Sequence, residues 1–217
     1  SMKEVINLLL LLLFITHFTI YSQNISNTTL KINHGDIILY LTPDSLSMVS
    51  KHTISYSNIL KLDTDRDNRW FQDSIKSKYK KEIYSRSGYD LGHLTPSHIT
   101  SYDDVLNHAS FSFLNQAPQL IKFNRGKWSK LEGSVEDSIT KYKLNSIIIT
   151  GVIYNENKPT YLNNSKIKIP THYYKILYIN KLLYCWLGSN IDGEIKIITI
   201  KDLNVLFKSN GMKIKIK

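Results

Sequence analysis

The alternation of apolar and polar residues is clearest in the C-terminal third of the chain. The run Ser-Ile-Ile-Ile-Thr-Gly-Val-Ile-Tyr at residues 146–154 is almost continuously apolar, which is typical of a buried strand. Three further strand-like runs follow, at residues 173–179, 182–187 and 195–200. We expect a last helix to begin near Lys201 and to end before Gly211, because glycine commonly follows the end of a helix.

The middle of the chain has one strong helical pattern. Between Lys127 and Tyr142, large apolar residues recur every three or four positions, at Trp128, Leu131, Val135 and Ile139. We interpret Trp128 and Leu131 as core residues of this helix rather than as surfaces on which bases stack. By contrast, residues 65–88 are polar, charged and rich in tyrosine, so they predict a long surface segment with one helical turn.

Shorter strands are predicted in the N-terminal half. Residues 36–41 and 52–56 have strand character, and Pro43-Asp44-Ser45 supplies turn residues between them. Residues 110–114 alternate in the manner of a half-buried strand. Mixed strands with a few helices predict an α+β domain with a central, largely antiparallel sheet flanked by helices.

The N-terminus predicts an export signal. After Lys3 comes an apolar run over residues 8–15, and a polar stretch rich in Asn, Ser and Thr begins at Gln23. A short basic start, an apolar stretch and a small residue before the cut are the features of a secretory signal peptide. We therefore expect cleavage near Ser22/Gln23 and a mature protein that is secreted or periplasmic.

This interpretation divides the chain into three segments. They are a signal peptide at residues 1–22, a polar leader at residues 23–35 and one domain at residues 36–217. A membrane anchor is the alternative to cleavage. The apolar run is short for a membrane span and is interrupted at Thr16 and His17, so we expect no stable membrane association after cleavage.

Charge and cysteine content narrow the range of functions. The 217 residues carry a formal net charge of +10, and removal of Lys3 together with Glu4 leaves that charge unchanged. A basic balance suits a polyanionic partner such as nucleic acid. A genome poor in G and C, which enriches lysine everywhere, explains the charge equally well. Cys185 is the only cysteine, which excludes an intramolecular disulfide and a cysteine-rich zinc site, and its apolar neighbours favour a buried thiol.

Two segments contain the residue types that hydrolysis of a phosphodiester requires. The reaction needs a deprotonated water, neutralised charge on the phosphorane and a stabilised leaving alkoxide. The first segment, Asp-Leu-Gly-His-Leu-Thr-Pro at residues 90–96, contains a histidine that can accept the proton. The second begins as Asn-Gln-Ala-Pro-Gln at residues 115–119 and continues as Asn-Arg-Gly-Lys-Trp-Ser-Lys-Leu-Glu at residues 124–132. It places an asparagine at the start of a helix and a glutamate two turns later.

These segments resemble the DNA/RNA non-specific endonucleases of the ββα-metal type, which include secreted bacterial nucleases and mitochondrial endonuclease G. The family pattern is Asp-Arg-Gly-His-Leu-x-Pro, then Asn…Pro-Gln, then Asn-Arg-Gly-x-Trp-x-x-Leu-Glu. The chain matches this pattern at all but one position, and weaker similarity extends over most of residues 36–212. The resemblance implies the ββα-metal nuclease fold and a metal-dependent endonuclease.

The resemblance implies a role for each matched residue. His93 would be the general base that activates water. Asn124 would be the direct protein ligand to Mg²⁺, for which Mn²⁺ is an alternative. Glu132 would hold metal-bound water. Asn115 would support the site by hydrogen bonding, and Arg66 would contact the scissile phosphate, so that His93, Asn115, Glu132 and Arg66 form the expected catalytic set.

Two further residues, Asp90 and Gly92, are expected to support the loop that presents the histidine. The departure from the family pattern is Leu91, which stands where the family has an arginine that helps to neutralise phosphate charge. Lys127, Lys130 and Arg125 are the nearby cations that could compensate, and the sequence alone does not say whether they do.

The expected partners are DNA and RNA, bound through phosphate contacts with slight base preference and cut to give 5′ phosphates. The alternative is a catalytically impaired nuclease-fold protein that binds nucleic acid but cuts it poorly because of Leu91. A toxin-like effector that needs a neutralising partner protein is a third possibility. The sequence does not identify that inhibitor protein. The resemblance also leaves a homodimer open.

Overall fold

The computed structural model describes residues 30–63, 65–75, 77 and 79–216. The predicted signal peptide at residues 1–22 lies outside these ranges, as does the part of the predicted leader that precedes Leu30. Within the described ranges, no helix is both long enough and apolar enough to cross a membrane.

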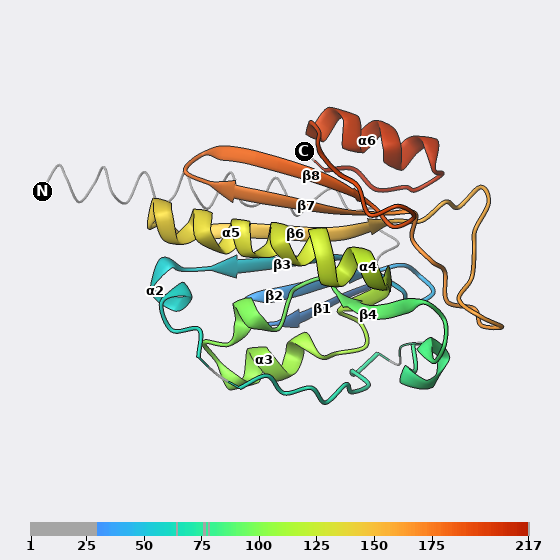
Figure 1. Ribbon diagram of the computed structural model, residues 1–217, viewed down its shortest axis with the longest axis horizontal. Helices are drawn as coiled ribbons and strands as arrows, with labels where there is room; N and C mark the ends of the chain where they lie inside the picture. Colours follow the sequence, from blue (N-terminus) through green and yellow to red (C-terminus); the bar gives the residue numbers. More distant parts are fainter. Residues whose placement is uncertain (1–29, 64, 76, 78, 217) are drawn as a thin grey trace, which may run out of the picture.

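A seven-stranded sheet forms the centre of the molecule (Figure 1). In spatial order its strands are β1 (Leu30–His34), β2 (Ile37–Leu41), β3 (Ser47–Ile54), β6 (Ser146–Ile153), β7 (His172–Ile179), β8 (Leu182–Ser189) and β9 (Ile195–Ile197). All neighbouring strands pair antiparallel. The predicted α+β domain with a central, largely antiparallel sheet is confirmed.

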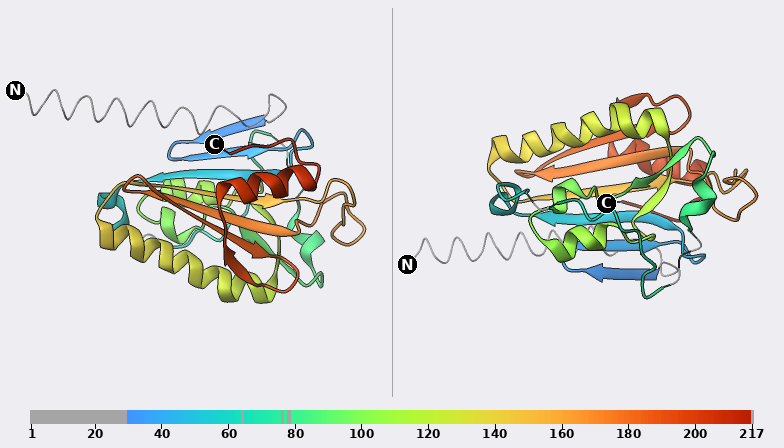
Figure 2. Two further views of the ribbon diagram at one scale, coloured as in Figure 1. Left: turned by 90° about the horizontal axis from the view of Figure 1, so that it is seen from above. Right: turned by 60° about the horizontal axis from the view of Figure 1, so that its bottom comes forward.

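Helices cover both faces of this sheet. They are α2 (Tyr56–Ile59), α3 (Asp104–Ser110), α4 (Ile121–Phe123), α5 (Ser129–Tyr142) and α6 (Ile200–Ser209), with shorter helical turns η1 (Lys81–Tyr84), η2 (His98–Thr100) and η3 (Asn124–Trp128). Figure 2 shows α5 and α6 on different sides of the sheet. Side chains alternate along β7, so Tyr174 and Ile176 join the core cluster that contains α6, while Leu177 packs with Val135 of α5.

A separate two-stranded sheet carries the first motif and leads into the long helix. β4 (Tyr89–His93) pairs antiparallel with β5 (Gln116–Leu120), which sets His93 opposite Gln116. The chain then passes through α4 and η3 into α5, with a kink at Gly126. In Figure 1, β4 lies beside α4, near the start of α5. This strand, strand, helix order is the one that the ββα-metal fold predicts.

Most of the elements predicted from strong periodicity are confirmed. The predicted helix at residues 127–142 corresponds to α5 preceded by η3, and the predicted strand at residues 146–154 corresponds to β6. Strands β7 and β8 and helix α6 also lie where the sequence predicted them. Trp128 is fully buried and Cys185 is 2% exposed, as expected of core residues.

Four predictions need correction. Residues 30–34, assigned to the polar leader, form the edge strand β1. The predicted strand at residues 110–114 is an irregular buried segment that makes an isolated bridge to Phe71, so its apolar residues reflect burial rather than strand periodicity. β3 begins at Ser47, well before the predicted start at residue 52, and β9 ends at Ile197, before residue 199 caps α6.

Candidate active site

An open cleft of about 590 Å³ lies where β4, η3 and the first turn of α5 meet. A cleft of this size is within the usual range for ligand-binding sites. Residues from separate parts of the chain border it, and among them are five of the predicted site residues, Arg66, Asp90, His93, Asn124 and Glu132. The other two, Asn115 and Gly92, are buried and do not border the cleft.

His93 ends β4 with its ring between aromatic side chains. The ring centre lies 4.6 Å from that of Trp70 and 5.0 Å from that of Phe111. Nε2 is buried and has no hydrogen-bond partner within the described part of the chain, which leaves Nδ1 to meet a ligand in the cleft. Burial and, as the smaller cause, the nearby positive charge of Arg66 together lower the pKa of His93 to about 3. The ring is therefore neutral at pH 7 and able to accept a proton.

Arg66 brings a cation to the same cleft. Its guanidinium carbon lies 5.1 Å from the centre of the Phe111 ring, and its Nε donates to Asn68 Oδ1 at 2.7 Å. The Phe111 ring also contacts His93 edge to face, so one aromatic side chain supports both groups. A phosphate that reaches Nδ1 of His93 would therefore lie close to a positive charge.

Asp90 holds two residues of η3 in place. Its two carboxylate oxygens accept hydrogen bonds from Arg125, at 2.8 Å from Nε and 2.7 Å from Nη2, and Oδ2 also accepts from Asn124 Nδ2 at 3.0 Å. Burial raises the pKa of Asp90, but the hydrogen bonds outweigh burial and the pKa is lowered overall. Because the amide nitrogen of Asn124 is directed to Asp90, its amide oxygen is available to a ligand.

Glu132 lies in the first turn of α5, two turns beyond Asn124. Its side chain is 20% exposed and borders the cleft, and its Oε1 lies 3.5 Å from Lys175 Nζ. Burial raises the pKa of Glu132, whereas the charge of Lys175 opposes that rise. The positive end of the α5 dipole also favours a carboxylate here.

The donor atoms of the cleft fit a hard divalent cation. The amide oxygen of Asn124 and the carboxylate of Glu132 are the ligand type that Mg²⁺ and Mn²⁺ prefer. Among the residues that the structure describes, no three His, Cys, Asp or Glu side chains gather into a metal-binding cluster. The arrangement therefore suits an ion that keeps most of its ligands as water, as Mg²⁺ does.

Asn115 and Gly92 act on the site from within the core. Asn115 is fully buried, and its Oδ1 accepts from Thr95 N–H at 3.0 Å. Its Nδ2 donates to the carbonyl oxygens of Thr95 and Ser110, both at 2.8 Å. These bonds hold the loop that follows His93. At Gly92 the two short strands are so close that an added Cβ would lie 2.3 Å from Gln119 Oε1.

Comparison with known proteins identifies the family of the chain. The model of the family described as DNA/RNA non-specific endonuclease matches residues 17–182. The chain belongs to this family. It is 30% identical to nuclease C1 of Cunninghamella echinulata var. echinulata, over 55% of this chain and 54% of that protein. It is 27% identical to the mitochondrial nuclease of Saccharomyces cerevisiae, over 65% of this chain and 44% of that protein.

The fold of this non-specific endonuclease domain also has a solved counterpart. A chain in the crystal structure of an EndoG/EndoGI complex superposes with a TM-score of 0.70 at 23% identity, covering 83% of each chain. This likeness shows a shared fold. The chain spans about half the length of the curated relatives it matches.

Leu91 is the position at which this endonuclease domain departs from its family pattern. Its side chain borders the cleft and packs against the same core cluster as Trp70. Of the three cations expected to compensate, only Arg125 borders the cleft. Lys127 pairs with Glu194 instead, and Lys130 is exposed on α5 outside the cleft.

Several side chains that support the cleft residues were not predicted from the sequence. Trp70 and Phe111 enclose His93, but neither belongs to a regular element, so periodicity could not reveal them. Asn107 was missed as well. Its Oδ1 accepts from Asp67 N–H at 3.1 Å and its Nδ2 donates to Ser97 O at 2.9 Å, which ties the segment after Arg66 to the loop after β4.

Proposed function

We propose that this chain is an exported, Mg²⁺-dependent endonuclease that hydrolyses phosphodiester bonds in both DNA and RNA. The observation that carries the proposal is a neutral histidine, His93, in one cleft with the oxygen donors of Asn124 and Glu132. Membership of the DNA/RNA non-specific endonuclease family supports it.

In this proposal His93 takes the proton of the attacking water at Nδ1. Trp70 and Phe111 fix the ring, so the nitrogen stays directed to the cleft without a rotamer change. A base with a pKa near 3 is weak in the free protein. An entering phosphate raises that pKa, because a negative charge nearby favours the protonated ring. The histidine therefore gains basicity when substrate binds.

Asn124 would hold the metal through its amide oxygen, and Glu132 would accept hydrogen bonds from water bound to the ion. When bound, Mg²⁺ neutralises charge on the phosphorane and stabilises the leaving oxygen. Asp90 contributes by holding the Asn124 amide at 3.0 Å, which fixes the direction of its oxygen. Mn²⁺ is a chemically suitable substitute.

Arg66 contacts the scissile phosphate, and Arg125, which also borders the cleft, adds positive charge. Water attacks in line with the bond to the 3′ oxygen, so the products carry 5′ phosphates. Recognition through phosphates rather than base edges gives slight sequence preference.

Export is part of the same proposal. It is supported by the apolar run over residues 8–15 and the polar stretch that starts at Gln23. The N-terminal sequence of protein recovered from the periplasm or the medium should begin at Gln23. Membrane-bound protein that retains residues 8–15 would support the anchor instead.

A digestion assay tests the activity. The purified chain is incubated with plasmid DNA or a long RNA, in Mg²⁺ or in EDTA, beside the His93→Ala variant. We expect both substrates to be lost only with metal, and His93→Ala to be slower by about 10²- to 10⁴-fold. Undiminished cleavage by a folded His93→Ala variant would show that another group is the base.

The impaired, binding-only protein remains the second candidate, because Leu91 leaves one wall of the cleft without the cation of the family pattern. Intact substrates that are retarded on a gel in Mg²⁺ would favour it. Metal-dependent turnover would exclude it.

A further inference from the structure

A buried lysine lies next to Glu132 without reaching the cleft. Lys175, on β7, is 1% exposed, which is rare for a lysine. Glu132 borders both the cleft and a smaller cavity, whereas of these two Lys175 borders the smaller cavity only. Glu132 is thus a side chain that pairs with Lys175 and also borders the cleft.

Contacts from three elements fix the ammonium group of Lys175. Its Nζ donates to Thr150 Oγ1 of β6 at 2.7 Å and lies 5.1 Å from the centre of the Trp128 ring. On the third side, Nζ lies 3.5 Å from Oε1 of Glu132, on α5. The ammonium group is thus held on the central sheet and directed at one oxygen of the glutamate.

From this geometry we propose that Lys175 is a positioning residue for the metal site, because it holds Oε1 of Glu132 against the sheet and leaves Oε2 to face the cleft. The inference rests on the proposed function, since it takes Glu132 as the carboxylate that orders water around the metal. Lys175 itself touches neither metal nor nucleic acid.

Stability alone is a weak explanation for the buried Lys175–Glu132 ion pair. An apolar side chain of similar length fills such a space without the desolvation that two buried charges require. The location is also informative, because the pair joins the sheet to the first turn of α5, the turn that borders the cleft. Glu136 and His52 border the same small cavity as Lys175, among apolar side chains such as Val135 and Ile148.

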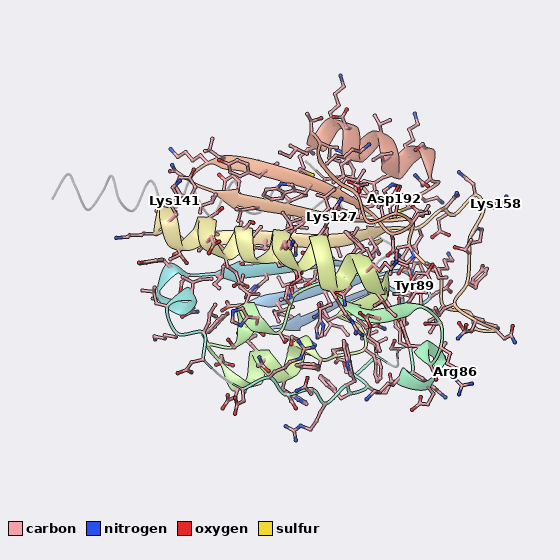
Figure 3. The ribbon with its side chains drawn as sticks, viewed as in Figure 1. Arg86, Tyr89, Lys127, Lys141, Lys158 and Asp192 are labelled. Carbon is pink, nitrogen blue, oxygen red and sulfur yellow. The ribbon has the colours of Figure 1, made fainter. Side chains whose placement is uncertain are left out.

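Metal binding by the Lys175→Met variant tests the proposal without relying on activity. Mn²⁺ affinity of the full chain is measured by titration calorimetry without nucleic acid. We expect Lys175→Met to bind Mn²⁺ about 10- to 100-fold more weakly, and its kcat to fall while KM for DNA stays unchanged. Lys141→Met is the matched control, because Lys141 is exposed at the far end of α5 (Figure 3).

Thr150→Val keeps the test informative if Lys175→Met does not fold, and two variants at Glu132 test whether Lys175 acts through that glutamate. Thr150→Val removes the hydrogen bond to Nζ but keeps the charge, and it should weaken Mn²⁺ binding in the same direction. Glu132→Gln and the double variant Glu132→Gln/Lys175→Met should bind Mn²⁺ equally. A folded Lys175→Met with wild-type Mn²⁺ affinity, or a double variant weaker than Glu132→Gln, would overturn the proposal.

Failure of this inference differs from failure of the proposed function. If the unaltered chain neither binds Mn²⁺ nor cuts nucleic acid, the proposed function fails and takes the inference with it. If the unaltered chain does both, and Lys175→Met and Thr150→Val behave like it, only the role of Lys175 is wrong.

Discussion

Leu91 is the single residue in the two motifs that differs from the family pattern, because it lacks the positive charge of the arginine found there. Because it borders the cleft, a longer side chain there can place its end beside a bound phosphate. We expect Leu91→Arg to raise kcat/KM by about 10- to 100-fold, since one added cation near the developing charge has an effect of this size. Leu91→Met, which keeps the size without the charge, is the control. Equal rates for the three proteins, at equal stability, would show that this wall needs no cation.

The low pKa of His93 gives a second prediction at this scale. Burial and the charge of Arg66 lower that pKa to about 3 in the free chain, so the ring stays unprotonated as the pH falls through about 6.5. An ordinary histidine is protonated below that pH and loses its function as a base. We therefore expect kcat/KM, measured at saturating Mg²⁺, to show no acid limb near pH 6.5. A limb centred there would contradict the buried environment of the base.

Individual residues could be assigned to the cleft only where a motif contains them. The sequence placed His93, Asn124 and Glu132 near one another, and the cleft does contain all three. Lys175 could not be predicted, because lysine is normally a surface residue and its burial depends on a partner from another element. Its one sequence signal is its place inside the apolar strand Tyr-Tyr-Lys-Ile-Leu at residues 173–177.

Between elements, the distance from β4 to β5 depends on the absence of a side chain at Gly92. A Cβ there would lie 2.3 Å from Gln119 Oε1 and 2.5 Å from Gln119 Cβ. We expect Gly92→Ala to lower the free energy of unfolding by about 1–3 kcal/mol through overpacking, as measured by urea denaturation.

Compensating changes at Gln119 provide the control. Because the clash includes the Cβ of Gln119, Gly92→Ala/Gln119→Gly should recover part of the loss, whereas Gly92→Ala/Gln119→Ala should recover less. Equal stabilities for the two double variants would mean that the strands separate instead of clashing.

Elements were predictable where one period continues over many residues. The helix α5 and the strand β6 have such patterns, and both were located within a few residues. Residues 110–114 misled the prediction, because they are all buried while the backbone runs irregularly after α3. In that segment burial comes from tertiary packing around Trp70 and His93, which a local pattern does not encode.

At the scale of the whole molecule, the net charge of +10 predicts binding that depends on salt. If about four phosphates are neutralised, affinity should fall by about 10²-fold between 50 and 200 mM NaCl. The binding of His93→Ala protein to labelled DNA measures this. Adding Arg66→Ala should reduce the log–log slope by about one, whereas Lys158→Ala, on the distant loop after β6, should not (Figure 3). Affinity that is insensitive to salt would contradict phosphate-led binding.

Along the sequence, the residues of the cleft come before a helix that the fold needs for its stability. Every residue that borders the cleft lies between Arg66 and Glu132, whereas α6 begins at Ile200 and buries Leu203 and Phe207 in the core. We expect a chain that stops at residue 199 to retain every residue that borders the cleft, yet to be unfolded by circular dichroism and inactive in the digestion assay. Substantial cleavage by that fragment would refute this. A ribosome adds α6 after every residue that borders the cleft. If the proposed function is right, a growing chain therefore contains its active-site residues before it can fold, and its own messenger RNA is not cut while α6 is still missing.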